Sequence, residues 1–157
     1  WAKENSSSSL AGFALMCGVF FFSCCARYGR RSTLESTLLQ STFLKNAFTL
    51  AAWVGSYGAK AFGGNDLPKP SALIMQYTGY SEYSKNDPPT FACVGESDGI
   101  ADYRIMKARL DAMKKLRIDT EFHSYKGLHH GFGLGENTVA DGWINSAVKF
   151  WEKQMKG

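Results

Sequence analysis

Two short polar segments contain the residue types that acid–base chemistry uses. The segment YKGLHHGFGLG (125–135) carries two of the chain's three histidines, His129 and His130, between a short apolar run and a glycine-rich loop. The segment GESDG (95–99) carries an aspartate, Asp98. A carboxylate that orients an imidazole, which takes and later returns a proton, makes up two thirds of an acyl-transfer triad. Whether these side chains meet depends on the elements that hold them.

Apolar patterning predicts the elements on either side of both segments. SALIMQYTG (71–79) and PPTFACVG (88–95) are short apolar runs that end in glycine, as buried strands do. Residues 101–117 have the period of an amphipathic helix, and DTEFHSY (119–125) alternates like a strand. The apolar positions of that helix are Met106, Leu110, Met113 and Leu116.

A second amphipathic helix is predicted at the end of the chain, over residues 138–154. Thr138 followed by Asp141 has the spacing of a capping box, so we expect the helix to open there. Its apolar stripe would consist of Val139, Trp143, Ala147, Phe150 and Trp151.

The order strand, helix, strand predicts that Asp98 and the histidine pair lie together. Such a crossover makes the two strands parallel, and open α/β sheets build their sites at the carboxyl edge. Asp98 precedes His129 and His130 by 31 and 32 residues but follows the neighbouring strand. A plain Asp-Gly turn and a surface histidine are the alternative interpretation. His123 lies inside an expected strand, which favours a structural role.

Composition limits the classes of protein to consider. A chain of 157 residues that is 45% hydrophobic and 20% charged is long enough and apolar enough for one globular domain. The net charge of +4 comes from small basic groups without interleaved aromatic residues, so we expect no nucleic-acid partner. The cysteines lack the spacing of a metal site, and no cofactor is implied. They are Cys17, Cys24, Cys25 and Cys93.

Residues 1–50 differ in texture from residues 51–157, and we treat them as an atypical N-terminal segment before a domain. The run at 10–26 is uncharged over 17 residues and follows a single lysine, Lys3. That pattern is compatible with a short membrane span, a signal remnant or a buried segment. We expect no sheet strands from this segment. We interpret it as foreign sequence joined to the domain.

Residues 51–154 resemble the C-terminal half of α/β-hydrolase fold esterases and lipases, particularly the group related to acetyl xylan esterases. The matching motifs are LPKPSALIMQYTG, PPTFACVGESDGIA, YKGLHHGFGLG and GWINSAVKFWEKQ. The resemblance implies a mostly parallel sheet with flanking helices, in which the N-terminal half of the fold is missing or replaced. It also implies that Asp98 is the triad carboxylate and that His130, directly before Gly-Phe, is the base. His129 would have a local role or none.

The nucleophile that the resemblance requires is not found in the sequence. The family's serine lies on a Gly-x-Ser-x-Gly elbow, which should come just before residue 51, but residues 41–50 read STFLKNAFTL. Ser56 in VGSYG is followed by a glycine at the right distance, but Val54 occupies the first glycine position. Ser56 is therefore a weak nucleophile candidate, with a helix end or turn as the alternative role.

Two functions from different classes follow from these observations. The resemblance implies a carboxylic ester hydrolase acting on a small ester, such as an acetylated carbohydrate, through an acyl-enzyme. The alternative is a non-catalytic hydrolase fragment that binds a partner or does not fold alone, with self-association through an unpaired sheet edge and uncovered Trp53, Phe62 and Met75. Family members are frequently secreted or periplasmic, and residues 10–26 would allow membrane association.

Overall fold

The computed structural model describes most of the chain. The described residues are 11–16, 19–24, 47–64 and 68–156. Within them the backbone of 11–16, 19–24 and 47–50 is described without its side chains.

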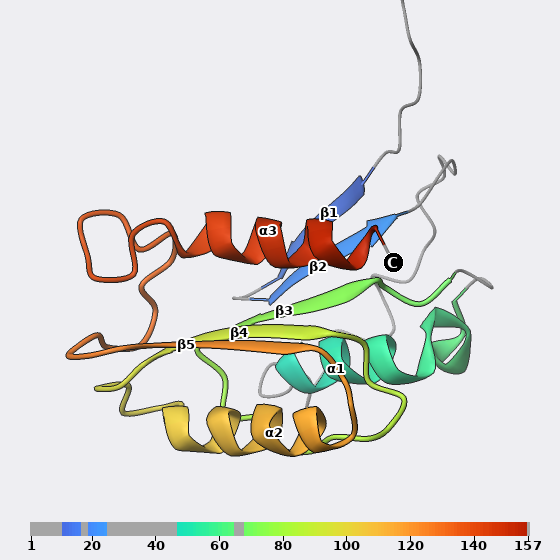
Figure 1. Cartoon of the computed structure of the whole chain (residues 1–157), viewed down its shortest axis with the longest axis horizontal. Helices are drawn as coiled ribbons and strands as arrows, with labels where there is room; N and C mark the ends of the chain where they lie inside the picture. Colours follow the sequence, from blue (N-terminus) through green and yellow to red (C-terminus); the bar gives the residue numbers. More distant parts are fainter. Residues whose placement is uncertain (1–10, 17–18, 25–46, 65–67, 157) are drawn as a thin grey trace, which may run out of the picture.

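Three neighbouring parallel strands form one side of the sheet (Figure 1). They are β3 (Ala72–Gln76), β4 (Thr90–Gly95) and β5 (Thr120–Tyr125). Every residue of β3 and β4 is buried, which explains why both read as continuous apolar runs instead of alternating patterns. All three strands lie within the segments that the sequence predicts.

The sheet continues on the other side of β3 through an antiparallel pair. This pair consists of β1 (Ala11–Met16) and β2 (Val19–Cys24), and the sheet order is β1-β2-β3-β4-β5. The expectation that residues 1–50 supply no strand is therefore wrong, because two apolar six-residue runs pair with each other and the second of them, β2, also pairs with β3. β3 has neighbours on both sides, so it is not a sheet edge.

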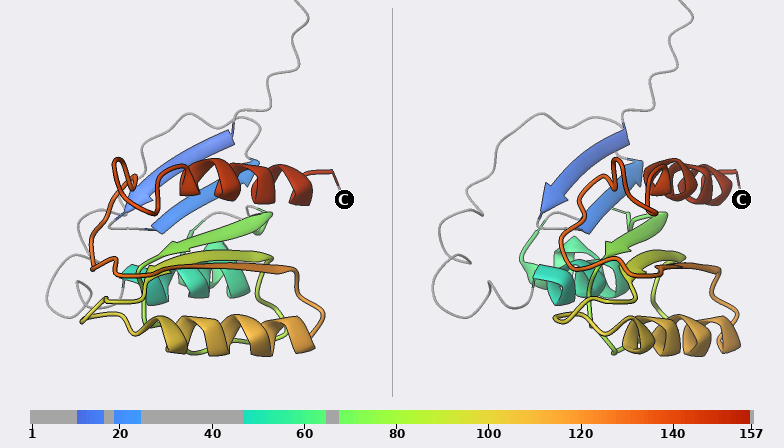
Figure 2. Two further views of the ribbon diagram at one scale, coloured as in Figure 1. Left: turned by 60° about the vertical axis from the view of Figure 1, so that its left-hand side comes forward. Right: turned by 90° about the vertical axis from the view of Figure 1, so that its left-hand side faces the viewer.

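Helices cover both faces of the sheet, which gives three layers (Figures 1 and 2). Helix α3 (Trp143–Gln154) lies on one face. Helices α1 (Ala47–Tyr57) and α2 (Tyr103–Lys115) lie on the other, and a short 3-10 turn, η2 (Ala59–Phe62), follows α1. One core cluster packs Ile74, Phe91 and Cys93 against α3, and the other packs Leu73, Met75, Ala92 and Val94 against α1 and α2.

Helix α2 begins where its sequence supplies a cap. The side chain of Asp102 accepts a hydrogen bond from the backbone N–H of Arg104 at 2.9 Å, as an N-cap aspartate does. Met106, Leu110 and Met113 are buried as predicted. Leu116 was expected on the same stripe but is 45% exposed, because the helix ends one residue before it.

Helix α3 begins five residues later than predicted. The hydroxyl of Thr138 donates to the carbonyl of Gly135 at 2.7 Å and accepts from the N–H of Ala140 at 3.1 Å, so it stabilises a turn and no helix end. Gly142 then adopts a left-handed conformation directly before the helix. The capping-box prediction was wrong, and Val139 is an exposed turn residue instead of a core residue.

All three apolar side chains expected to lack cover, Trp53, Phe62 and Met75, have packing partners. Met75 is fully buried in the core, and the ring of Trp53 stacks on that of Phe62 at 6.4 Å. Trp53 itself remains 38% exposed. In the part of the chain that the structure describes, no helix is long and apolar enough to cross a membrane.

Candidate functional site

The structure brings Asp98 and His130 together at the carboxyl edge of the sheet. β4 and β5 pair in parallel up to Gly95 opposite Tyr125, so the turns that follow them start side by side. Asp98 lies in the first turn and His130 in the second. Oδ2 of Asp98 is 2.8 Å from Nδ1 of His130, a normal hydrogen-bond distance. This is the juxtaposition that the strand, helix, strand order predicts.

The carboxylate of Asp98 is fixed by its own turn. Its Oδ1 accepts hydrogen bonds from the backbone N–H groups of Ile100 and Ala101, both at 2.8 Å. The side chain is 0% exposed, whereas that of His130 is 31% exposed. With Oδ1 occupied by the backbone, Oδ2 is the oxygen available to the imidazole. The buried acid is therefore held in one orientation, and the histidine is accessible.

The two turns are also bound to each other through their backbones. The N–H of Glu96 donates to the carbonyl of Tyr125 at 2.9 Å, and that of Ser97 donates to the carbonyl of Leu128 at 3.0 Å. Gly95 lies so close to the second turn that a Cβ placed on it would be 2.1 Å from the Leu128 oxygen. Glycine is required here by this close approach and not by its φ, since Gly95 is still part of β4.

Aromatic rings line the other side of His130. The ring of Tyr77, directly after β3, meets the imidazole edge to face at a centroid distance of 4.8 Å. It meets the ring of Phe132 in the same way at 5.2 Å. The loop behind them is fixed by the indole N–H of Trp143, which donates to the carbonyl of Gly133 at 2.9 Å. The imidazole of His130 therefore contacts both the buried carboxylate of Asp98 and the ring of Tyr77.

Burial raises the pKa of two titratable groups near the acid–base pair. Loss of solvent contact raises the pKa of Tyr125 to about 12 and raises that of the fully buried Cys93 thiol well above its ordinary value. A thiol that is both protonated and inaccessible is not a nucleophile. Cys93 is therefore a core residue of β4.

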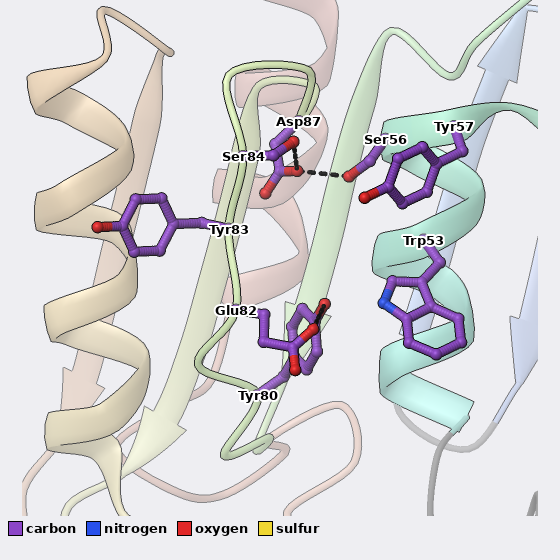
Figure 3. Close-up of a pocket in the computed structure, with 8 residues that line it drawn as sticks. All are labelled: Trp53, Ser56, Tyr57, Tyr80, Glu82, Tyr83, Ser84 and Asp87. Atoms are coloured by element: carbon purple, nitrogen blue, oxygen red, sulfur yellow. Dashed lines mark hydrogen bonds between the residues drawn. The ribbon is translucent and has the colours of Figure 1, made fainter.

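Ser56, the weak nucleophile candidate, is hydrogen-bonded in a different part of the molecule. It is 5% exposed near the end of α1, and its hydroxyl bonds to the carbonyl of Ala52 at 3.0 Å and to the carboxylate of Asp87 (Figure 3). Asp87 precedes β4 and Asp98 follows it, so the two aspartates lie at opposite ends of this strand. A six-residue strand is roughly 20 Å long. The pocket beside Ser56 includes no histidine among its lining residues.

A buried ion pair beside this pocket was missed by the sequence analysis. Arg109 on α2 is 2.8 Å from Asp87, and the two side chains are 0% and 3% exposed. Arg109 also donates to the carbonyl of Glu82 at 2.7 Å and lies over the ring of Tyr80. Burial lowers the pKa of Arg109 from its usual value, and the charge of Asp87 opposes that effect. The sequence did indicate that Arg109 is buried, because it lies three residues after Met106 and so on the same apolar stripe of the helix.

The other two histidines lie apart from the acid–base pair. Nε2 of His123 is 2.7 Å from Glu121, two residues earlier on β5, and its ring packs on Phe91 at 5.0 Å. This is the structural role expected for it. His129 is exposed, and the structure shows no hydrogen bond to its side chain from the described residues.

Comparison with known proteins places the fold. No family model matches the chain, and no curated protein matches it. Solved structures do. An alpha/beta hydrolase enzyme from a Medee basin deep-sea metagenome library is similar over 69% of this chain and 50% of its own, with a TM-score of 0.54 and 16% identity. A sugar hydrolase from Lactococcus lactis covers 68% of this chain and 54% of its own, with a TM-score of 0.52 and 20% identity.

A third solved structure agrees with these two. The carboxylesterase Cest-2923 from Lactobacillus plantarum matches 67% of this chain and 54% of its own, with a TM-score of 0.53 and 14% identity. The chain thus spans about half the length of each of these proteins. At such identities the likeness shows the fold, and the shared fold covers about two thirds of this chain.

Proposed function

We propose that this chain, which carries part of an α/β-hydrolase fold, provides the acid–base pair of a carboxylic ester hydrolase. The observation that carries the proposal is the 2.8 Å hydrogen bond between Asp98 and His130, made by a fully buried carboxylate. The solved structures of similar fold include a protein named as a carboxylesterase and one named as a sugar hydrolase, which supports a hydrolytic reaction. A small ester, such as an acetylated carbohydrate, is the proposed substrate.

In the proposed mechanism, each atom of the pair takes part in one step. Nδ1–H of His130 donates to Asp98, so Nε2 is the unprotonated nitrogen and accepts the proton of a nucleophilic hydroxyl as that oxygen attacks the ester carbonyl. The imidazolium, stabilised by Asp98, then protonates the departing alcohol. Water attacks the resulting acyl-enzyme through the same base, which releases the acid and restores the enzyme.

The nucleophile is the part of the mechanism that this proposal leaves unassigned. Among the described residues, no serine hydrogen bonds to His130. Ser56 is a poor candidate because its hydroxyl is engaged with Ala52 and Asp87. A fluorophosphonate probe followed by peptide mass spectrometry would identify a reactive serine directly.

The two adjacent histidines provide a matched experiment. Hydrolysis of p-nitrophenyl acetate is measured with the chain as it is, with His130→Ala and with His129→Ala. The proposal expects His130→Ala to reduce the rate to background and His129→Ala to leave it unchanged, because only His130 bonds to Asp98. Equal rates in all three proteins refute hydrolysis that depends on the pair. A loss confined to His129→Ala refutes the assignment of the base.

A second candidate function is that of a non-catalytic hydrolase fragment that associates through its sheet. Two observations favour it: the chain spans about half of each similar structure, and within the described residues β1 has no strand outside it. This candidate predicts association in size-exclusion chromatography. A sharp monomer peak with a cooperative thermal transition contradicts it. The nucleotide sequence of codons 40–55 adds a test, since another reading frame that encodes Gly-x-Ser-x-Gly would identify an altered esterase.

A further inference from the structure

Tyr77 has a backbone conformation that an aromatic residue rarely adopts. Its φ is 36°, in the left-handed region. Only two other non-glycine residues of the described chain have a positive φ: Asn137, a residue type that tolerates it, and Arg117, which lies two residues beyond the end of α2. Neither explanation applies to Tyr77, which directly follows the buried strand β3. A strained residue of this kind persists only where its surroundings impose the conformation, and such residues concentrate at functional sites.

The surroundings of Tyr77 fix both its backbone and its side chain. Its N–H donates to the carbonyl of Cys93 at 2.8 Å, which ties it to the end of β4. Its ring then meets the rings of His130 and Phe132 edge to face. The preceding residue, Gln76, bonds through its side-chain amide to the carbonyl of Gly133. The end of β3 is therefore joined to the loop that carries the histidine at three points.

The loop itself provides little to hold the imidazole. His130 is followed by Gly131 and, two residues later, by Gly133, with φ values of 81° and 54°. Neither glycine has a side chain that could block rotation of the ring. The hydrogen bond to Asp98 fixes one nitrogen, but a single bond leaves the ring free to tilt about it. A second contact is needed to define the plane, and Tyr77 supplies one at 4.8 Å.

We infer that Tyr77 is a positioning residue for His130. Its strained backbone brings the phenol ring against the imidazole and keeps Nδ1 on the Asp98 carboxylate, so that Nε2 stays directed at the reaction partner. The contacts that support this role are made by the ring. The contact itself does not depend on the ester hydrolase proposal, which only supplies the reason for holding the ring.

Nuclear magnetic resonance of the histidine side chains in the full chain tests this role. The proton on Nδ1 of His130 is identified as the downfield signal that disappears in His130→Ala. It is then followed in Tyr77→Phe, which keeps the ring, in Tyr77→Leu, which removes it, and in Tyr77→Gly, which removes it while suiting the left-handed backbone. Side-chain nitrogen signals of His123 and His129 report in the same spectra whether the fold is intact.

The expected result separates the ring from the backbone. The signal remains in Tyr77→Phe and is lost in Tyr77→Leu and Tyr77→Gly, with the signals of His123 and His129 unmoved. Retention of the signal in Tyr77→Gly overturns the inference, even if Tyr77→Leu does not fold. No ester is used, so a chain without esterase activity can still show this dependence, and the two proposals fail separately.

Discussion

Replacing Gly95 by alanine should separate the two turns that hold the acid–base pair. A Cβ at this position would be 2.1 Å from the carbonyl oxygen and 2.7 Å from the carbonyl carbon of Leu128. Ordinary van der Waals contact begins near 3.4 Å, so the Leu128 backbone has to retreat by roughly 1 Å. His130 is two residues further on. A shift of that size extends its 2.8 Å bond to Asp98 beyond the range of a hydrogen bond.

The same change should lower the stability of the protein measurably. Forced displacement of a packed segment costs about 1–3 kcal/mol, and for a chain of this size each kcal/mol lowers Tm by about 2–4 °C. Circular dichroism gives Tm, and the Nδ1 proton signal of His130 reports the bond to Asp98. Gly99→Ala is the matched control in the same turn, because a Cβ at Gly99 meets nothing within 4 Å. If Gly95→Ala leaves both Tm and the signal as in Gly99→Ala, the close approach does not constrain the site.

Two further predictions concern charge pairs of very different burial. Arg109→Met leaves the Asp87 carboxylate buried without its cation, so it should lower the free energy of unfolding in urea titrations by about 3–5 kcal/mol. Adding Asp87→Asn to the same chain should recover most of that loss. A loss below about 1 kcal/mol in Arg109→Met would contradict the pairing. The ammonium of Lys153 bonds to Asp119 at 2.7 Å and lowers the pKa of that carboxyl. The stability that this ion pair adds is present above the unfolded pKa of aspartate, about 3.9. It is lost as the pH falls through the lower folded pKa. Both groups are partly exposed, so Lys153→Met should reduce Tm only slightly at pH 7 and not at all near pH 2, and a difference that does not vary with pH would be evidence against this coupling.

The central part of the fold could be predicted because its signals are local and redundant. The apolar runs around β3 and β4 are bounded by prolines and glycines, and α2 carries both its cap and its stripe. Once a helix is placed between two strands, the direction of the second strand follows. The meeting of Asp98 and His130 is thus a consequence of connectivity, and it needed no knowledge of side-chain packing.

The features that sequence patterns missed are those set by tertiary contacts. Thr138 and Asp141 have the spacing of a capping box, but hydrogen bonds of the threonine to its own turn and the left-handed Gly142 delay the helix. The sequence around Tyr77 does not indicate a positive φ, because the residues that impose this conformation are far away in sequence. The ion pair of Arg109 was missed because its acceptor, Asp87, lies 22 residues earlier in the chain, outside α2.

The placement of the acid and the base on consecutive elements has a consequence for the order in which the protein opens. Asp98 and His130 both belong to the unit formed by β4, α2 and β5, whose strands pair along their full length. Units of this kind tend to unfold cooperatively as one foldon. The hydrogen bond between the two side chains should therefore share the lifetime of the unit, and survive fluctuations that open the β1–β2 end of the sheet.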